Sequence, residues 1–144
     1  MTTHKNISSD LIFSSSLDLW ISEKSELENC RGAAARLILG SPVIDQIIKL
    51  EREQGREIIF VRMSDAALGI PLLGISTEHL TLERARDLGF NDSEANLLAL
   101  AGNFLGLENA VNLPLLMGDR DLSSTVYDAF NVAFGNESYW PEEF

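Results

Sequence analysis

The sequence predicts an α+β fold: a mostly helical single domain, residues 1–144, with a small antiparallel sheet whose strands lie near 56–63 and 70–76. Three observations support this class. The length suits one domain with one core. Several stretches place apolar residues at helical spacing between capping residues and glycines. The segment REIIFVRM at 56–63 follows a glycine and is rich in β-branched and aromatic residues, which is typical of a strand.

Two helices are predicted in the first half of the chain. An S-x-x-E capping box at 25–28 predicts a helix that runs to Leu39, with Gly40 as its C-cap. Ser-Pro at 41–42 begins a second helix, with Ser at the N-cap and Pro at the first helical position, and Gly55 ends it. We expect the two helices to form an αα-hairpin or a bent pair.

The connection between the two predicted strands fixes their relative direction. The connecting segment, 64–69, is six residues long. This length allows the two strands to pair antiparallel but is too short for the crossover that a parallel pair needs. Pro71 suggests an edge strand. Before the first helix, residues 11–21 are expected to form a short strand or an irregular docked segment, and the polar residues 1–10 are expected to fray.

Three further segments follow the strands. Thr81 begins a helix that Gly89 stops. A second capping box at 91–94 begins a helix to about Leu105, which is apolar on most sides and is therefore expected to be the buried centre of the fold. Gly102 inside this helix indicates a close backbone contact.

The last part of the chain is predicted to be a loop or short strand at 112–118, followed by a final helix. Asp121 is expected to cap this helix, and Gly135 to end it. The apolar stripe of the final helix is expected to consist of Leu122, Val126, Phe130, Ala133 and Phe134.

Several features favour a soluble cytoplasmic protein. The longest apolar-rich stretch, 95–107, is well short of the roughly 20 residues that span a bilayer. Residues 1–12 lack the basic and apolar pattern of a targeting segment. The single cysteine, Cys30, permits no intrachain disulfide, as is usual in a reducing compartment.

No catalytic residue, metal site or cofactor is predicted. The chain has two histidines, and His79, with Glu83 four residues on, is expected to be a surface histidine near a helix start. One cysteine and two distant histidines cannot build a structural zinc site. The D-x-D motif at 119–121 could suggest Mg²⁺, but Asp121 has the role of a helix cap. Phosphate-binding glycine motifs are missing from the sequence.

Direct nucleic-acid binding is also disfavoured. Residues 81–105 have the outline of a helix-turn-helix, yet the second helix carries Glu94 and no lysine or arginine. Basic side chains that neutralise phosphates supply most non-specific affinity for DNA. We therefore interpret this pair of helices as core packing.

The distribution of charge is the most informative feature. The formal net charge is −11. Residues 1–86 contain 12 acidic and 10 basic side chains, whereas residues 87–144 contain 10 acidic side chains and one basic one, Arg120. Such a field repels nucleic acid and anionic membranes and attracts basic surfaces.

This pattern predicts a small acidic binding or inhibitor protein that neutralises a basic, nucleic-acid-acting partner. An immunity protein for a nuclease toxin fits, as does a phage-encoded inhibitor that mimics nucleic-acid charge; the partner would be a basic protein or a nucleoprotein complex. Aromatic side chains in the acidic tail would either dock onto the protein's own core or help to capture the partner. The predicted partner-binding residues are Asp119, Asp121, Asp128, Glu137, Tyr139, Trp140, Glu142, Glu143 and Phe144.

Two other functional classes remain open. The first is a small enzyme of unknown class that uses His79 or a carboxylate as its base, although the chain is poor in histidine and lacks a nucleophile motif. The second is an adaptor or assembly subunit that uses the apolar region 66–76 as its interface.

Overall fold

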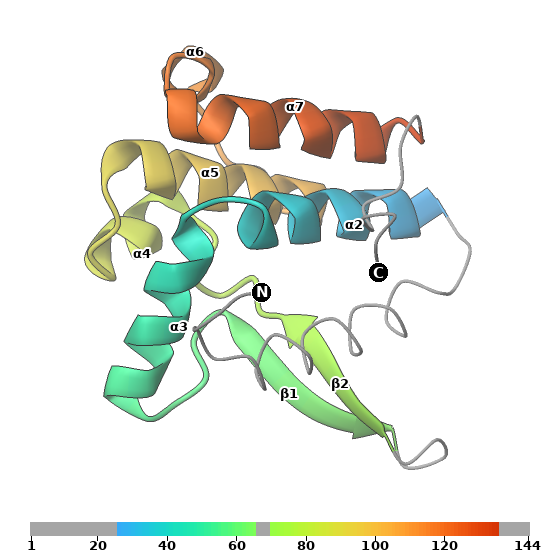
Figure 1. Cartoon of the computed structure of the whole chain (residues 1–144), viewed down its shortest axis with the longest axis vertical. Helices are drawn as coiled ribbons and strands as arrows, with labels where there is room; N and C mark the ends of the chain where they lie inside the picture. The colour runs from blue at the N-terminus through green and yellow to red at the C-terminus, as the bar shows by residue number, and fades with distance from the viewer. Residues whose placement is uncertain (1–25, 66–69, 136–144) are drawn as a thin grey trace.

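The computed structural model describes residues 26–65 and 70–135 (Figure 1). The expected features of residues 1–10 and 11–21 lie outside these ranges. In chain order, the elements are α2 (Glu26–Leu39), α3 (Val43–Gln54), β1 (Phe60–Asp65), β2 (Ile70–Ile75), α4 (Leu82–Asp87), α5 (Asp92–Phe104), α6 (Leu113–Met117) and α7 (Arg120–Ala133).

The predicted α+β class is wrong, because the protein is mostly helical and closer to an all-α fold. Strands β1 and β2 pair antiparallel, from Phe60 opposite Ile75 to Asp65 opposite Ile70, and within the described residues they pair only with each other. A two-stranded ribbon is too small to form a layer of the core. The body is built instead by helices: α2 packs against α5 and α7, and α4 packs against α5. Figure 1 shows α2 running along both α5 and α7, with the hairpin below the three helices.

The first predicted strand also begins later than expected. It was placed at 56–63, but β1 starts at Phe60. The backbone N–H groups of residues 58–60 point to the buried carboxylate of Glu51 near the end of α3. The N–H groups of Ile58 and Ile59, which precede β1, therefore have a side-chain acceptor and need no strand partner, which fits the later start of the strand.

Local signals in the first half predicted the helix ends well. Helix α2 ends at Leu39, directly before Gly40. Helix α3 begins at Val43, one residue later than predicted, with Pro42 at its N-cap. The Ser41 hydroxyl accepts a hydrogen bond from the Val43 N–H at 3.4 Å. Gly55 ends α3 in the left-handed conformation, with φ of 64°, as predicted.

The buried central helix is confirmed. In the capping box of α5, the Asn91 side chain accepts from the Glu94 N–H, and the Glu94 carboxylate accepts from the Asn91 N–H, both at 2.8 Å. Every residue from Ala95 to Gly102 is buried. A Cβ atom on Gly102 would lie 2.5 Å from the backbone oxygen of Leu80, so the predicted close backbone contact is present.

Two predictions for the last part of the chain are wrong. Residues 113–117 form the short helix α6 instead of a loop or strand; the Asn112 side chain accepts a hydrogen bond from the Leu115 N–H. Helix α7 begins at Arg120, and Asp119 is its N-cap in place of Asp121. The Asp119 carboxylate accepts a hydrogen bond from the Asp121 N–H at 2.9 Å. The helix therefore begins at Arg120, two residues before the predicted start at Leu122.

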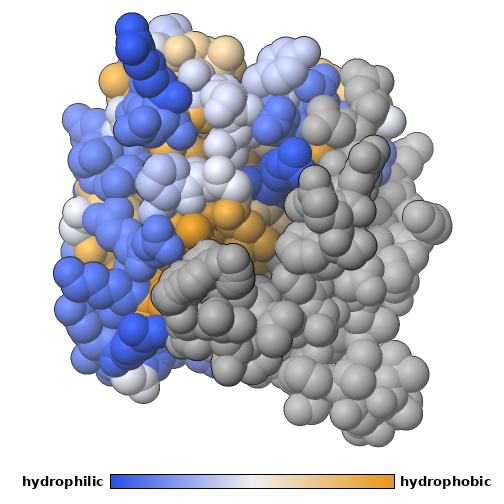
Figure 2. Space-filling model, viewed as in Figure 1, coloured by the Kyte–Doolittle hydropathy of each residue, from blue (hydrophilic) through white to orange (hydrophobic). Residues whose placement is uncertain are grey.

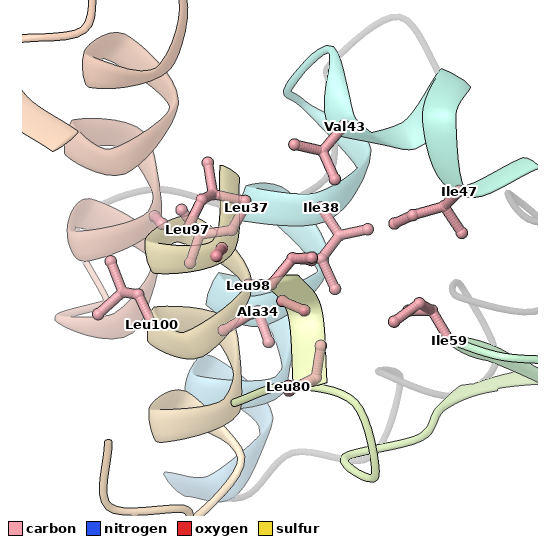
Figure 3. Packing of buried hydrophobic residues seen from close by; sticks show 14 of the residues in the cluster. Ala34, Leu37, Ile38, Val43, Ile47, Ile59, Leu80, Leu97, Leu98 and Leu100 are labelled. Atoms are coloured by element: carbon pink, nitrogen blue, oxygen red, sulfur yellow. The ribbon is translucent and has the colours of Figure 1, made fainter. Parts of the chain in front are cut away.

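The core lies between the helices. Figure 3 shows Leu37 and Ile38 of α2 close to Leu97 and Leu98 of α5, with Ile47 of α3 reaching towards the group. The fully buried Ala33–Ala35 segment of α2 has small side chains, which allows its neighbours to approach closely. Among the helices of the described ranges, none is both long and apolar enough to cross a membrane.

Candidate interaction surface on α6 and α7

Three of the predicted partner-binding residues lie within the described ranges. Asp119, Asp121 and Asp128 all lie on α7 or at its start. The other predicted residues lie outside the described ranges: Glu137, Tyr139, Trp140, Glu142, Glu143 and Phe144. The apolar region 66–76 of the adaptor hypothesis falls mostly outside the side chains that are described.

Asp119 and Asp121 lie at the start of α7. The Asp119 carboxylate satisfies one of the N–H groups that a helix leaves unpaired in its first turn. Asp121 is exposed and lies within the first turn, where the partial positive charge of the helix dipole stabilises a carboxylate. Asp119 therefore has a structural role, while Asp121 keeps its carboxylate at the surface.

Asp128 connects α7 to α2. Its carboxylate lies 3.7 Å from the Arg36 guanidinium of α2, and both side chains are partly exposed. Ion pairs in such positions contribute little to stability, about 0–1 kcal/mol. The pair does, however, neutralise much of the charge that Asp128 would present to a partner.

Other carboxylates near α5 are also used within the fold. The Asp92 carboxylate lies 3.0 Å from Arg86 of α4, and Glu94 closes the capping box. Asp121 and Glu108 are exposed, and neither has one of these structural roles. The overall imbalance persists, because residues 87–135 contain seven acidic side chains and one basic one.

Sequence reasoning missed a group of exposed apolar side chains on α6 and α7. We call it the α6–α7 apolar strip; its members are Leu113, Leu115, Met117, Tyr127 and Phe134. Phe134 was predicted to belong to the buried stripe of the final helix, and this is wrong, because 73% of it is exposed. In Figure 2, apolar and strongly hydrophilic atoms adjoin at the top of the view, where Figure 1 places α6 and the start of α7.

The strip follows from the helical positions of its residues. On α7, Tyr127 and Phe134 are seven residues apart, so they lie almost on one line along the helix. On α6, only Leu116 is buried, and it anchors the short helix to the core. The neighbouring leucines and Met117, which is 52% exposed, consequently face outward.

Hydrogen bonds hold the segment that leads into α6. The Asn109 side-chain amide donates to the backbone oxygens of Leu80 and Ala99, each at 2.9 Å. Asn103 and Asn109 also exchange two side-chain-to-backbone bonds. The Asn112 N–H donates to the Asn96 side-chain oxygen at 2.8 Å. These bonds fix the segment before α6 relative to α5, so the exposed side chains of α6 have a defined position.

An aromatic contact connects the strip to the interior. The Phe134 ring stacks on Phe130 with centroids 6.1 Å apart, and Phe130 meets Phe104 of α5 edge-on at 5.4 Å. The exposed end of α7 is therefore supported by the central helix.

The residues considered as catalytic or metal-binding candidates have surroundings that differ from those expected from the sequence. His79 is mostly buried, and its Nε2 atom lies 3.8 Å from Glu78; the sequence had suggested Glu83 as its neighbour. Cys30 is a half-buried thiol on α2. Across ranges 26–65 and 70–135, no three or more His, Cys, Asp or Glu side chains come together as a metal site.

Comparison with known proteins gives no relative. The chain matches no protein-family model, and neither a curated protein nor a solved structure is significantly similar to it.

Proposed function

We propose that the protein is a small acidic binding protein that neutralises a basic, nucleic-acid-acting protein, as an immunity protein for a nuclease toxin or a phage-encoded charge mimic would do. The observation that carries this proposal is the charge of the second half, where residues 87–135 contain seven acidic side chains and one basic one. Helices α5 and α7, which contain most of these residues, belong to a well-packed helical body.

The physical basis is electrostatic steering. Two unit charges about 8 Å apart in water interact by about 0.5 kcal/mol, which is close to thermal energy. Several carboxylates therefore act together on a positive cleft, but only within the Debye length of about 8 Å at physiological salt. A basic nucleic-acid-binding cleft offers the matching charge, and an acidic scaffold that fills it would block the substrate.

Exposed carboxylates are the ones best placed to contact a partner. Asp121 and Glu108 are exposed, whereas Asp128 is close to Arg36. We expect the first two to contribute more to binding than Asp128. The proposal places the protein in the cytoplasm, where the thiol of Cys30 stays reduced.

An inhibition assay tests the proposal. The full-length protein is added in stoichiometric amounts to a panel of purified basic nucleases and other nucleic-acid-cleaving enzymes, and cleavage is measured at several NaCl concentrations. We expect at least one enzyme to be inhibited at a one-to-one ratio, with inhibition weakening as salt increases. Failure to inhibit any member of the panel, or inhibition that is independent of salt, would contradict the proposal.

A charge-matched pair of variants supplies the control. The variant Glu108→Gln with Asp121→Asn removes two exposed carboxylates from the acidic half. The variant Asp45→Asn with Glu53→Gln removes two exposed carboxylates from α3, so its net charge is identical. Inhibition should weaken in the first variant and persist in the second. Equal loss in both would show a non-specific effect of net charge.

A further inference from the structure

The elements of this fold are packed to different degrees. Helix α5 is buried continuously from Ala95 to Gly102, and α2 packs closely against both α5 and α7. Helix α3 buries only Val43, Ile47 and Glu51, and its contact with α2 is smaller than the contacts among the other helices. Within the described ranges, β1 and β2 pack mainly against each other. We therefore distinguish a helical body, formed by α2 and α4–α7, from an arm, formed by α3, β1 and β2.

The arm meets the body through a narrow apolar contact. Figure 3 shows Ile47 and Ile59 at one edge of the labelled core residues, with Ile38 of α2 between them and Leu97 of α5. Segments with few buried apolar contacts open at a lower free energy than the core of a protein. The arm therefore has less apolar burial to lose on opening than α5 has. Much of α3 faces solvent instead, with exposed side chains at Asp45, Gln46, Lys49, Arg52, Glu53 and Gln54.

The body holds the chain on both sides of the arm. Before α3, the Thr125 hydroxyl of α7 donates a hydrogen bond to the Gly40 oxygen at 3.0 Å. After β2, the Asn109 side-chain amide donates to the oxygen of the buried Leu80 at 2.9 Å. An opening that is confined to the chain between these two points leaves the hydrogen bonds and the helix packing of the body in place.

Glu51 connects the two parts of the arm. One oxygen of its buried carboxylate accepts hydrogen bonds from the N–H groups of residues 58–60, at 2.8 to 3.0 Å. If α3 or the hairpin moved alone, all three bonds would break, whereas joint movement preserves them. Hydrogen bonds to a charged group are stronger than those between neutral groups. Opening as one unit therefore costs less than opening of either part by itself.

We infer that α3 and the hairpin open from the helical body as one unit, and that the Glu51 carboxylate is the link that makes them move together. In the open form, Ile47 and Ile59 leave the apolar core, and the cluster that they complete becomes accessible to solvent. Helix α7 belongs to the body, so Asp121 and its neighbours keep their positions when the arm opens. The opening is thus independent of the acidic surface on which the proposed function rests.

Native-state hydrogen exchange tests the inference. Exchange of the full-length protein is followed by NMR in a series of low urea concentrations. We expect the amides of α3, β1 and β2 to share one opening free energy and one dependence on urea. After correction for intrinsic rates, they should exchange at least about tenfold faster than the buried amides of α2, α5 and α7, with a smaller urea dependence because less surface is exposed.

A matched pair of variants tests the link. Glu51→Gln keeps an acceptor oxygen but loses the charge, and Glu53→Gln makes the same change at an exposed position of α3. In Glu51→Gln, we expect the amides of the hairpin to exchange about tenfold faster than in the wild type, while those of α3 change less, because the weakened link lets the hairpin open alone. In Glu53→Gln, the two parts should still share one opening free energy. Protected amides in α5 confirm that each variant is folded.

Two results would overturn the inference. If the amides of the arm and of α5 have the same opening free energy and the same urea dependence, the protein opens only as a whole. If α3 and the hairpin already exchange with different free energies in the wild type, or still share one in Glu51→Gln, the carboxylate does not link them. Neither result bears on nuclease inhibition, which tests the proposed function separately.

Discussion

Glu51 provides the sharpest test of how the fold is held together. Its side chain is buried near the end of α3, with the whole residue only 7% exposed. One carboxylate oxygen accepts hydrogen bonds from three consecutive backbone N–H groups, those of Ile58, Ile59 and Phe60, at 3.0, 2.8 and 2.9 Å. This contact fixes the start of the hairpin to the helical body. We predict that Glu51→Ala destabilises the protein strongly.

The magnitude follows from the groups that lose their acceptor. A buried donor left without a partner costs about 1–3 kcal/mol, so three such groups cost roughly 3–9 kcal/mol if nothing replaces the carboxylate. Water that enters the space vacated by the side chain can satisfy some of them. We therefore expect a loss of about 3–5 kcal/mol, as when one member of a buried charged interaction is removed. Typical domains have about 5–15 kcal/mol of total stability.

Urea unfolding followed by circular dichroism measures the loss, and hydrogen exchange locates it. The amides of residues 58–60 should be protected in the wild type and exchange much faster in Glu51→Ala. Glu53→Ala is the matched control, because Glu53 is exposed on the same helix. It should change the unfolding free energy by less than about 0.5 kcal/mol. Glu51→Gln retains an acceptor oxygen without the charge and should fall between the two.

The reasoning about Glu51 would be refuted if Glu51→Ala and Glu53→Ala had equal unfolding free energies while the amides of residues 58–60 stayed protected. That result would mean that the three N–H groups find equivalent partners elsewhere, and that the carboxylate does not hold the hairpin to α3.

Four further substitutions test other contacts, each by urea unfolding. Gly102→Ala should cost about 1–3 kcal/mol, because the new Cβ would meet the Leu80 backbone oxygen at 2.5 Å; wild-type stability would refute the close approach. Asn109→Ala should cost about 1–3 kcal/mol, since it removes two donors from carbonyl groups, and unchanged exchange in α6 would argue against its role. Asn91→Ala should cost about 1 kcal/mol through loss of the capping box, whereas Asn91→Asp should be nearly neutral. Thr125→Val should cost about 1 kcal/mol, because its hydroxyl donates to the Gly40 oxygen at 3.0 Å; no loss would show that this bond contributes nothing.

Features with a local cause could be predicted from the sequence. The capping box at 91–94, the left-handed end of α3 at Gly55 and the close approach at Gly102 each depend on residues within one or two turns, or on the absence of a side chain. The overall class could not be predicted, because it depends on whether strands find further partners. Composition indicates a strand but does not reveal the number of its neighbours.

The errors on α6 and α7 have a similar cause. The run LPLLM at 113–117 is too short and too uniformly apolar to show helical periodicity. On α7, the buried positions include Thr125 and Val132, and Phe134 faces outward. The predicted stripe followed the largest apolar residues of the helix and therefore included Phe134. The side of α7 that meets α2 is decided instead by the helix period and by the hydrogen bond from Thr125 to the Gly40 oxygen.

The structure changes how the acidic hypothesis has to be tested, because carboxylates that looked equivalent in the sequence have different roles. Removing Asp119 removes a helix cap, at a typical cost of about 1 kcal/mol, and removing Asp128 leaves Arg36 without that partner. A weaker complex after removal of Asp119 could therefore reflect weakened folding, and one after removal of Asp128 could reflect the positive charge left on Arg36. Asp121 has an exposed carboxylate and no comparable role in the described contacts. Loss of the helix-dipole interaction should cost about 0.3–1 kcal/mol in Asp121→Asn, so a fall in binding with no larger loss of unfolding free energy would separate recognition from stability.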